Sequence, residues 1–347
     1  MVVVRFIVLL NKNPNNNLFK FMNIKTAEFV SPGHPDKICD FIADSILDAY
    51  LALDKNSRVA VEVMGGHNLI TINGEVTSEA SPDIEKVVRE IVPARNVSGI
   101  ADVGGGENFE LKINLSKQSL EISRGVDTGG AGDQGIMKGY ATSETESMMP
   151  REYDLARNLC MKIYEKYPYD GKVQVTLEND LVKTVVVSFQ NSKNFELLPL
   201  VKNIIKAEEY IINQSGEWTV GGFDADTGLS GRKIVIDNYG PEIPVGGGSF
   251  SGKDYTKVDR SGAYMARKIA VDFVKNKKAK EVFVKLAYAI GKPEPVMAVA
   301  IVDGKEIKIE NYDLTPAGIK KILKLNKVNF AETSKWGHFG RGFNWDK

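Results

Sequence analysis

The sequence predicts an α+β protein with three similar units. The chain has 347 residues, more than the roughly 150 residues of one typical domain. An order of helix, two strands and helix occurs three times along it, and the leading helices start near residues 36, 152 and 259. Antiparallel strand pairs flanked by amphipathic helices should place the helices on one face of each mainly antiparallel sheet.

The first unit opens with an amphipathic helix, for which Pro35 suits the first helical position. Two β-rich runs follow at residues 59–63 and 69–72, and Asn73–Gly74 directly after them is a hairpin-turn signal. Pro82 and Asp83 then stand in the first turn of a second helix that should continue to residue 91.

The second and third units repeat this order. The second should contain a helix at 152–167, strands at 172–177 and 183–189 across an Asn179–Asp180 turn, and a helix at 195–212. The third should contain a helix at 259–275, strands at 281–289 and 296–302, and a helix at 315–325. An Asn-rich extension at residues 1–21 precedes all three units, has an apolar run too short to span a bilayer, and is expected to be dispensable.

Composition excludes several classes of function. Lys plus Arg and Asp plus Glu each number 45, so the formal charge is zero, which argues against nucleic acid as the main partner. Two cysteines 121 positions apart offer neither a disulfide scaffold nor a thiolate zinc site, and we expect a cytoplasmic protein without a membrane partner. With three histidines, any metal should be a hard ion held by carboxylates.

Two glycine-rich segments resemble nucleotide-binding loops. Residues 130–135 match a dinucleotide fingerprint but lack the preceding buried strand. Residues 247–253 have the spacing of a phosphate-binding loop, but Asp254 stands where Ser or Thr would coordinate magnesium. Taken alone, each segment is better explained as a flexible turn.

Basic residues around the second segment favour a polyphosphate site. Glycine lets backbone N–H groups approach phosphate, and four cations here, Arg232, Lys233, Lys253 and Lys257, would offset its charge. Asp36 and Asp259 each open a predicted helix and could hold one magnesium beside phosphate oxygens. The alternative for Asp36 is a solvated acidic stripe that continues through Asp40, Asp44 and Asp48.

Three longer motifs resemble the signature segments of the S-adenosylmethionine synthetase family. They are SPGHPDK at residues 31–37, GAGDQG at 130–135 with GYAT at 139–142, and GGGSFSGKDYTKVDR at 246–260. The resemblance implies three α/β units related by pseudo-threefold symmetry. It also implies sequence segments at 24–118, 128–221 and 222–347 that interleave in space. The segment from Gln118 to Gly132, the family's mobile gate, is shorter here than in many members.

The resemblance also assigns site residues. Catalytic roles fall to His34, Lys172, Arg232, Lys233 and Lys253. ATP would contact these residues together with Asp170, Trp218, Asp226 and Ser249, and methionine would contact Glu75, Gln118, Asp133, Asp226 and Lys257. Asp36 and Asp259 would each hold one of two Mg²⁺ ions, and Glu62 would face a K⁺ ion.

The implied reaction joins ATP and L-methionine into S-adenosylmethionine and hydrolyses the triphosphate to phosphate and diphosphate. A homodimer or homotetramer with sites at the dimer interface is implied as well. Two other functions stay open at this stage: a different ATP-dependent enzyme such as a kinase, and a non-catalytic nucleotide-binding subunit.

Overall fold

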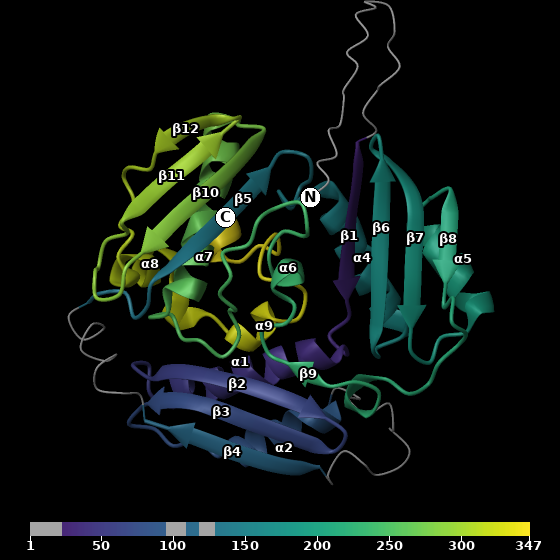
Figure 1. Cartoon of the computed structure of the whole chain (residues 1–347), viewed down its shortest axis with the longest axis horizontal. Helices are drawn as coiled ribbons and strands as arrows, with labels where there is room; N and C mark the ends of the chain where they lie inside the picture. Colours follow the sequence, from purple (N-terminus) through teal and green to yellow (C-terminus); the bar gives the residue numbers. More distant parts are fainter. Residues whose placement is uncertain (1–22, 95–108, 118–128) are drawn as a thin grey trace, which may run out of the picture.

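The computed structural model describes residues 23–94, 109–117 and 129–347, so the 1–21 extension and Gln118 lie outside the described residues. Three four-stranded sheets surround a centre that contains the short helices α6 (Ile234–Asp237) and α9 (Phe330–Thr333) (Figure 1). Together with eight described helices of the α type, these sheets confirm the α+β class.

Each sheet has a central hairpin and an edge strand that comes from a distant part of the chain. The first sheet has the order β4 (Glu110–Ser116), β3 (Leu69–Thr77), β2 (Arg58–Gly66), β9 (Gly228–Leu229). The second has the order β1 (Ile24–Val30), β6 (Gly171–Glu178), β7 (Leu181–Phe189), β8 (Glu209–Ile212). The third has the order β12 (Lys305–Lys308), β11 (Met297–Val302), β10 (Glu281–Tyr288), β5 (Gly135–Thr142).

Pairing within the sheets is mainly antiparallel. Only β3 with β4 and β7 with β8 run parallel among the described strands. The distant edge strands are β9, β1 and β5, which pair with β2, β6 and β10 respectively. No sheet is therefore built from one contiguous segment of the chain.

The turn prediction is right for the second sheet and wrong for the first. Asn179 and Asp180 have φ angles of 49° and 66°, as a two-residue hairpin turn between β6 and β7 requires. In the first sheet the turn lies at His67 and Asn68, with φ of 47° and 64°. Asn73–Gly74 instead continues β3, where Gly74 passes so close to Ala60 that an added Cβ would lie 2.1 Å from the Ala60 carbonyl oxygen.

The helix predicted over residues 195–212 is too long. Helix α5 (Asn194–Ile204) ends early, and residues 209–212 form β8 beside β7. The Tyr210 hydroxyl fixes the reversal because it accepts the Ala207 N–H at 2.7 Å and donates to the Ile205 carbonyl at 3.0 Å. β-branched Ile211 and Ile212 then favour the strand.

Helices cover one face of each sheet. In the first sheet, α1 (Pro35–Leu53) packs on β2 and on α2 (Ile84–Ala94). In the second, α4 (Arg151–Lys166) packs on β1, β6 and α5. In the third, α7 (Val258–Lys277) packs on β5, β10 and α8 (Pro316–Leu323). The strands alternate accordingly: Val59, Val61 and Val63 of β2 are buried toward the helices, whereas Glu62 and Met64 face away from them.

The aspartates of α1 are not a solvated stripe, so that expectation is wrong. Asp36, Asp40 and Asp44 are fully buried. Every member of the row accepts backbone N–H bonds from the C-terminal third of the chain: Asp36 from Leu229, Asp40 from Gly231, Asp44 from Gly252, and Asp48 from Phe330 and Ala331. The i, i+4 spacing places all four on one helix face, and we call this row the aspartate ladder.

Asp44 also neutralises the buried Arg260 of α7. Two guanidinium nitrogens lie 2.7 Å from the two carboxylate oxygens, and one of them also donates to Thr333 at 3.1 Å. Burial raises the pKa of Asp44, while the Arg260 charge opposes that shift. This bidentate pair joins α1 to α7 and α9 in the interior.

We expect Asp44→Asn to lower the free energy of unfolding by about 3–5 kcal/mol, because it leaves the Arg260 charge buried without a counter-charge. Urea titration of the variant and the wild type measures this difference. Glu90→Gln is the control, because Glu90 forms only an exposed ion pair with Lys86 at 3.9 Å and should change stability by less than about 1 kcal/mol. Equal losses in both variants would contradict the assignment.

Candidate active site

His34 caps the N-terminus of α1. Its Nδ1 accepts the Asp36 N–H at 3.2 Å, which leaves Nε2 as the protonated ring nitrogen. Burial and then the Lys233 charge lower the His34 pKa to about 3, so the imidazole stays neutral near pH 7. A neutral, oriented imidazole can donate a hydrogen bond but carries no charge of its own.

Asp36 holds two cations beside this histidine. Lys233 Nζ donates to one of its oxygens, and Arg232 Nε lies 3.3 Å from the other. Burial alone would raise the Asp36 pKa, but the hydrogen bonds from Lys233 and from Leu229 outweigh burial and lower it. The Arg232 side chain remains half exposed, so it can reach an anion outside.

Three further residues predicted from the sequence lie around His34. Lys172 and Asp226 are close enough to influence the His34 pKa, and both are exposed. Asp170 accepts the Gly222 N–H at 3.1 Å, and burial raises its pKa to about 6. Trp218 is half-buried rather than in the core, and its indole N–H donates to the Ser188 hydroxyl at 3.0 Å.

A second group of predicted residues surrounds the start of α7. Lys253 Nζ lies 2.7 Å from an Asp259 carboxylate oxygen. The glycine loop closes over this pair, since an added Cβ on Gly248 would lie 2.3 Å from Asp259. On the neighbouring strand β2, Glu62 accepts the Ser230 hydroxyl at 2.5 Å, and burial raises its pKa.

Adjacent residues connect the two groups. Ser249 lies against Gly231, the residue before Arg232, since an added Cβ on Gly231 would lie 2.6 Å from the Ser249 Cβ. Glu75 is exposed on β3 opposite Ala60, which itself pairs with Lys253.

Two predicted methionine contacts are not drawn into these groups. Lys257 bonds the buried Asp254 at 2.5 Å, and Asp254 also accepts the Val59 N–H at 2.7 Å. Asp254, which stands where a phosphate-binding loop would have Ser or Thr, thus stabilises the fold. Asp133 is exposed and accepts the next backbone N–H, that of Gln134.

Sequence reasoning missed a buried network behind the site. Lys37 is fully buried, and its ammonium lies 2.9 Å from Asp40 and 2.5 Å from Asp237. Asp40 holds the Gly231 N–H and Asp237 ends α6, so Lys37 fixes both sides of the segment that carries Arg232 and Lys233. Its place beside Asp36 in the SPGHPDK motif was the one available signal.

The described residues contain no group of three or more His, Cys, Asp or Glu side chains arranged to hold a metal ion. Among the described helices, none combines the length and the apolar character that a membrane-spanning helix needs. The site contains two groups of cations beside glycine-rich backbone. Asp36 holds Arg232 and Lys233, and Asp259 holds Lys253.

The fold and this cluster of oriented cations define a three-sheet α+β protein with a group of basic side chains beside glycine-rich loops. Models of the S-adenosylmethionine synthetase N-terminal, central and C-terminal domains match residues 22–119, 128–219 and 220–347. The chain belongs to the S-adenosylmethionine synthetase family.

Curated relatives agree with this membership. An S-adenosylmethionine synthase of Thermus thermophilus is 40% identical and covers 94% of this chain and 96% of the relative. The synthase of Parvibaculum lavamentivorans is 38% identical, and the match covers 93% of this chain and 95% of the relative. The synthase of Mycoplasmopsis pulmonis is 40% identical, and the match covers 92% of this chain and 94% of the relative.

We expect Lys37→Met to destabilise the protein more at pH 8 than at pH 5.5. Burial raises the Asp237 pKa to about 7 even though the Lys37 charge opposes the shift, so without that charge the pKa should rise further. When the pKa of a carboxyl group is higher in the folded than in the unfolded protein, the free energy of unfolding falls as the pH increases above the unfolded-state pKa. Urea titrations of wild type and variant at both pH values measure the loss, which should reach about 3–5 kcal/mol at pH 8. Lys162→Met on the exposed face of α4 is the control, and a pH-independent loss in Lys37→Met would contradict this assignment.

Proposed function

We propose that the protein makes S-adenosylmethionine from ATP and L-methionine and hydrolyses the triphosphate to phosphate and diphosphate. Family membership over 94% of the chain supports this reaction. The observation that carries it is the set of cations at Asp36, where Lys233 and Arg232 meet a neutral His34.

The chemistry of the methionine sulfur explains why the site contains cations and needs no general base. A methionine thioether has no proton to lose, so its attack on the ribose 5′-carbon forms the C–S bond as the C–O bond to triphosphate breaks, without a general base. Positioning and stabilisation of the departing charge must supply the rate. Lys172, Arg232, Lys233 and Lys253 would neutralise the triphosphate, and His34 Nε2 would donate to it.

The other contacts follow from the proposal. Trp218 offers a flat, half-buried face to adenine, and Asp170, Asp226 and Ser249 lie beside the cations that would hold the phosphates. For methionine we propose Glu75, Gln118, Asp133, Asp226 and Lys257.

The donor set fits Mg²⁺. Asp36 and Asp259 each offer one carboxylate beside lysine, and Mg²⁺ is commonly held by one or two carboxylates together with substrate phosphates and water. Bound there, Mg²⁺ would offset the charge of the polyphosphate. We propose these two aspartates for two Mg²⁺ ions and the oxygen-rich Glu62–Ser230 pair for K⁺.

We further propose that two chains complete each site in a homodimer or homotetramer. The helix-free face of the first sheet exposes Met64 and Leu229 side by side, close to the predicted residues Glu62 and Glu75, and a second copy would cover it. The shared plan of hairpin plus distant edge strand supports a pseudo-threefold relation among the three units. Free, buried Cys39 and Cys160 suit a cytoplasmic location.

The decisive experiment incubates the protein with ATP, methionine, Mg²⁺ and K⁺ and detects the sulfonium product by mass. Phosphate and diphosphate should appear in equal amounts with it. A kinase would give ADP and a phosphorylated acceptor without any need for methionine, and a binding subunit would give no product.

We expect Asp36→Asn and Asp259→Asn each to raise the Mg²⁺ concentration needed for half-maximal rate at least about tenfold, or ~1.4 kcal/mol. Synthesis and triphosphate hydrolysis should both fall, because both use the same polyphosphate contacts. Initial rates against Mg²⁺ concentration measure the effect. Asp180→Asn, in the β6–β7 turn, is the control, and an unchanged Mg²⁺ dependence in the two site variants would remove them as metal ligands.

His34→Gln should slow the single-turnover formation of the sulfonium by roughly 1.5–3 kcal/mol, the cost of one misplaced hydrogen bond to a charged group. The pH profile between 6 and 8 should keep its shape, because the His34 pKa of about 3 lies well below this range. Exposed His67→Gln is the matched control. An ionisation near neutral pH that disappears in the variant would show proton transfer by His34 and contradict catalysis by positioning.

Light scattering of the purified protein should give the mass of a dimer or a tetramer, because an isolated chain would expose the helix-free face of the first sheet and leave each site incomplete. Activity measured at the same protein concentrations should fall as dilution produces monomer. A monodisperse and fully active monomer would overturn the shared-site proposal.

A further inference from the structure

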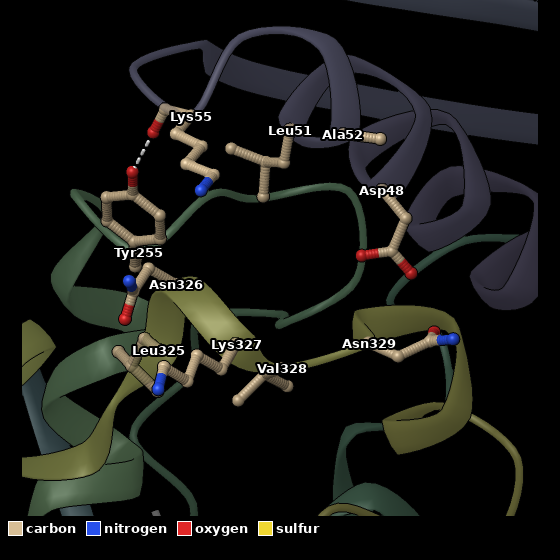
Figure 2. A pocket seen from close by; sticks show the side chains of 10 residues that line it. All are labelled: Asp48, Leu51, Ala52, Lys55, Tyr255, Leu325, Asn326, Lys327, Val328 and Asn329. Atoms are coloured by element: carbon tan, nitrogen blue, oxygen red, sulfur yellow. Dashed lines mark hydrogen bonds between the residues drawn. The ribbon is translucent and has the colours of Figure 1, made fainter.

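A cavity of about 360 Å³ lies between the C-terminal half of α1 and the residues that follow α8. One wall is the C-terminal half of α1, with Asp48, Leu51 and Ala52, and the opposite wall is the segment from Leu325 to Asn329 (Figure 2). Asp48 follows Asp36 by twelve residues, which is ~18 Å along the helix axis. None of the residues lining the cavity belongs to the proposed active site.

Part of the cavity lining is apolar. Leu51 of α1 points into the space, and Leu325 and Val328 form the opposite side (Figure 2). Leu325 is buried and anchors that side, whereas Leu51 and Val328 are half-buried and present their side chains to the cavity. Charged and amide side chains, those of Asp48, Lys55, Asn326, Lys327 and Asn329, complete the lining. A cavity of this size that combines apolar walls with polar groups is typical of small-molecule sites.

Tyr255 forms a fixed aromatic wall. Its hydroxyl donates to the Lys55 carbonyl and accepts from Lys320 Nζ at 2.9 Å, and the Lys320 ammonium lies 4.1 Å from the ring centroid. The Tyr255 side chain is buried, so these contacts hold the ring in one orientation. A planar or aliphatic group could pack beside it without moving the wall.

The charges available to a ligand are positive. The Lys55 ammonium points into the cavity in Figure 2, and Lys327 follows on the opposite wall. In the part of the chain that the structure describes, neither ammonium forms an ion pair. The one carboxylate, Asp48, already accepts the N–H groups of Phe330 and Ala331 at 3.0 and 2.8 Å.

We propose that this cavity binds a small organic anion, a carboxylate or phosphate monoester on an apolar body. The anionic group would pair with Lys55, and the apolar body would lie over Leu51 and Val328 beside the Tyr255 ring. A cationic ligand is disfavoured because the lining carries two ammonium groups and one carboxylate, and the oxygens of that carboxylate already accept the Phe330 and Ala331 N–H groups.

The test titrates the full-length protein, at saturating ATP to occupy the proposed active site, with indole-3-acetate and with uncharged indole-3-ethanol. Saturation-transfer NMR and calorimetry report binding. We expect saturable binding of the acid and at least tenfold weaker binding of the alcohol, because only the acid can pair with Lys55. Phenyl phosphate against phenylacetate, which share a ring, distinguishes the two kinds of anionic group.

Three variants test whether the probe binds in the cavity. Lys55→Met should weaken the binding of indole-3-acetate at least tenfold and leave the binding of indole-3-ethanol unchanged. Ala52→Trp should abolish the binding of both compounds by filling the cavity. Ala52 is exposed on α1, so the larger side chain spares the core; Val328→Trp fills the same space from the opposite wall. Lys162→Met is the matched control and should bind as wild type. An absence of saturable binding, or binding unchanged in Lys55→Met and both filled variants, overturns the proposal.

Discussion

The aspartate ladder of α1 is the constraint on which the rest of the molecule depends. A buried carboxylate costs several kcal/mol unless charges and hydrogen-bond donors surround it, and these four take backbone donors from residues 229, 231, 252, 330 and 331. Asp40 and Asp44 also need the buried cations Lys37 and Arg260. The paths of the loops near residues 229–233, 252 and 330 are therefore fixed by one helix.

The proposed active site lies at the Asp36 end of the same ladder. The buried Asp36 carboxylate is paired with Lys233 and Arg232 and accepts the Leu229 N–H. Lys233 and Arg232 are also the cations proposed to bind the polyphosphate. Because Asp40 and Lys37 hold the next turn of that segment, the cations are oriented before any anion arrives. Such preorganisation matters most for a reaction in which a large charge departs and no proton is abstracted.

Local patterns predicted the strand pair of each sheet and the helix starts, because they depend on neighbours in sequence, although the turn of the first hairpin was placed wrongly. The alternating valines of β6 and β7 and Pro35 at the start of α1 are examples. The two-residue strand β9 carries no pattern of its own and exists because β2 offers an edge. An i, i+4 row of aspartates likewise does not reveal which face it occupies. The motifs contain Asp36 and Asp259, and the group of basic residues near the glycine loop contains Lys233. The pairing of each aspartate with its lysine, and the contacts of Lys37, needed the tertiary structure.

Synthesis from the N-terminus meets a delay that follows from β1, β9 and the ladder. Asp48 and its partner Ala331 are 283 positions apart, so at ~5–20 residues per second the ribosome needs about 15–60 s to supply the second after the first. During that interval α1 presents carboxylates that only later residues can satisfy, and β2 lacks its edge strand. The amino-terminal third therefore cannot reach its final packing as a nascent chain, and the three units must assemble together once the carboxyl end is free.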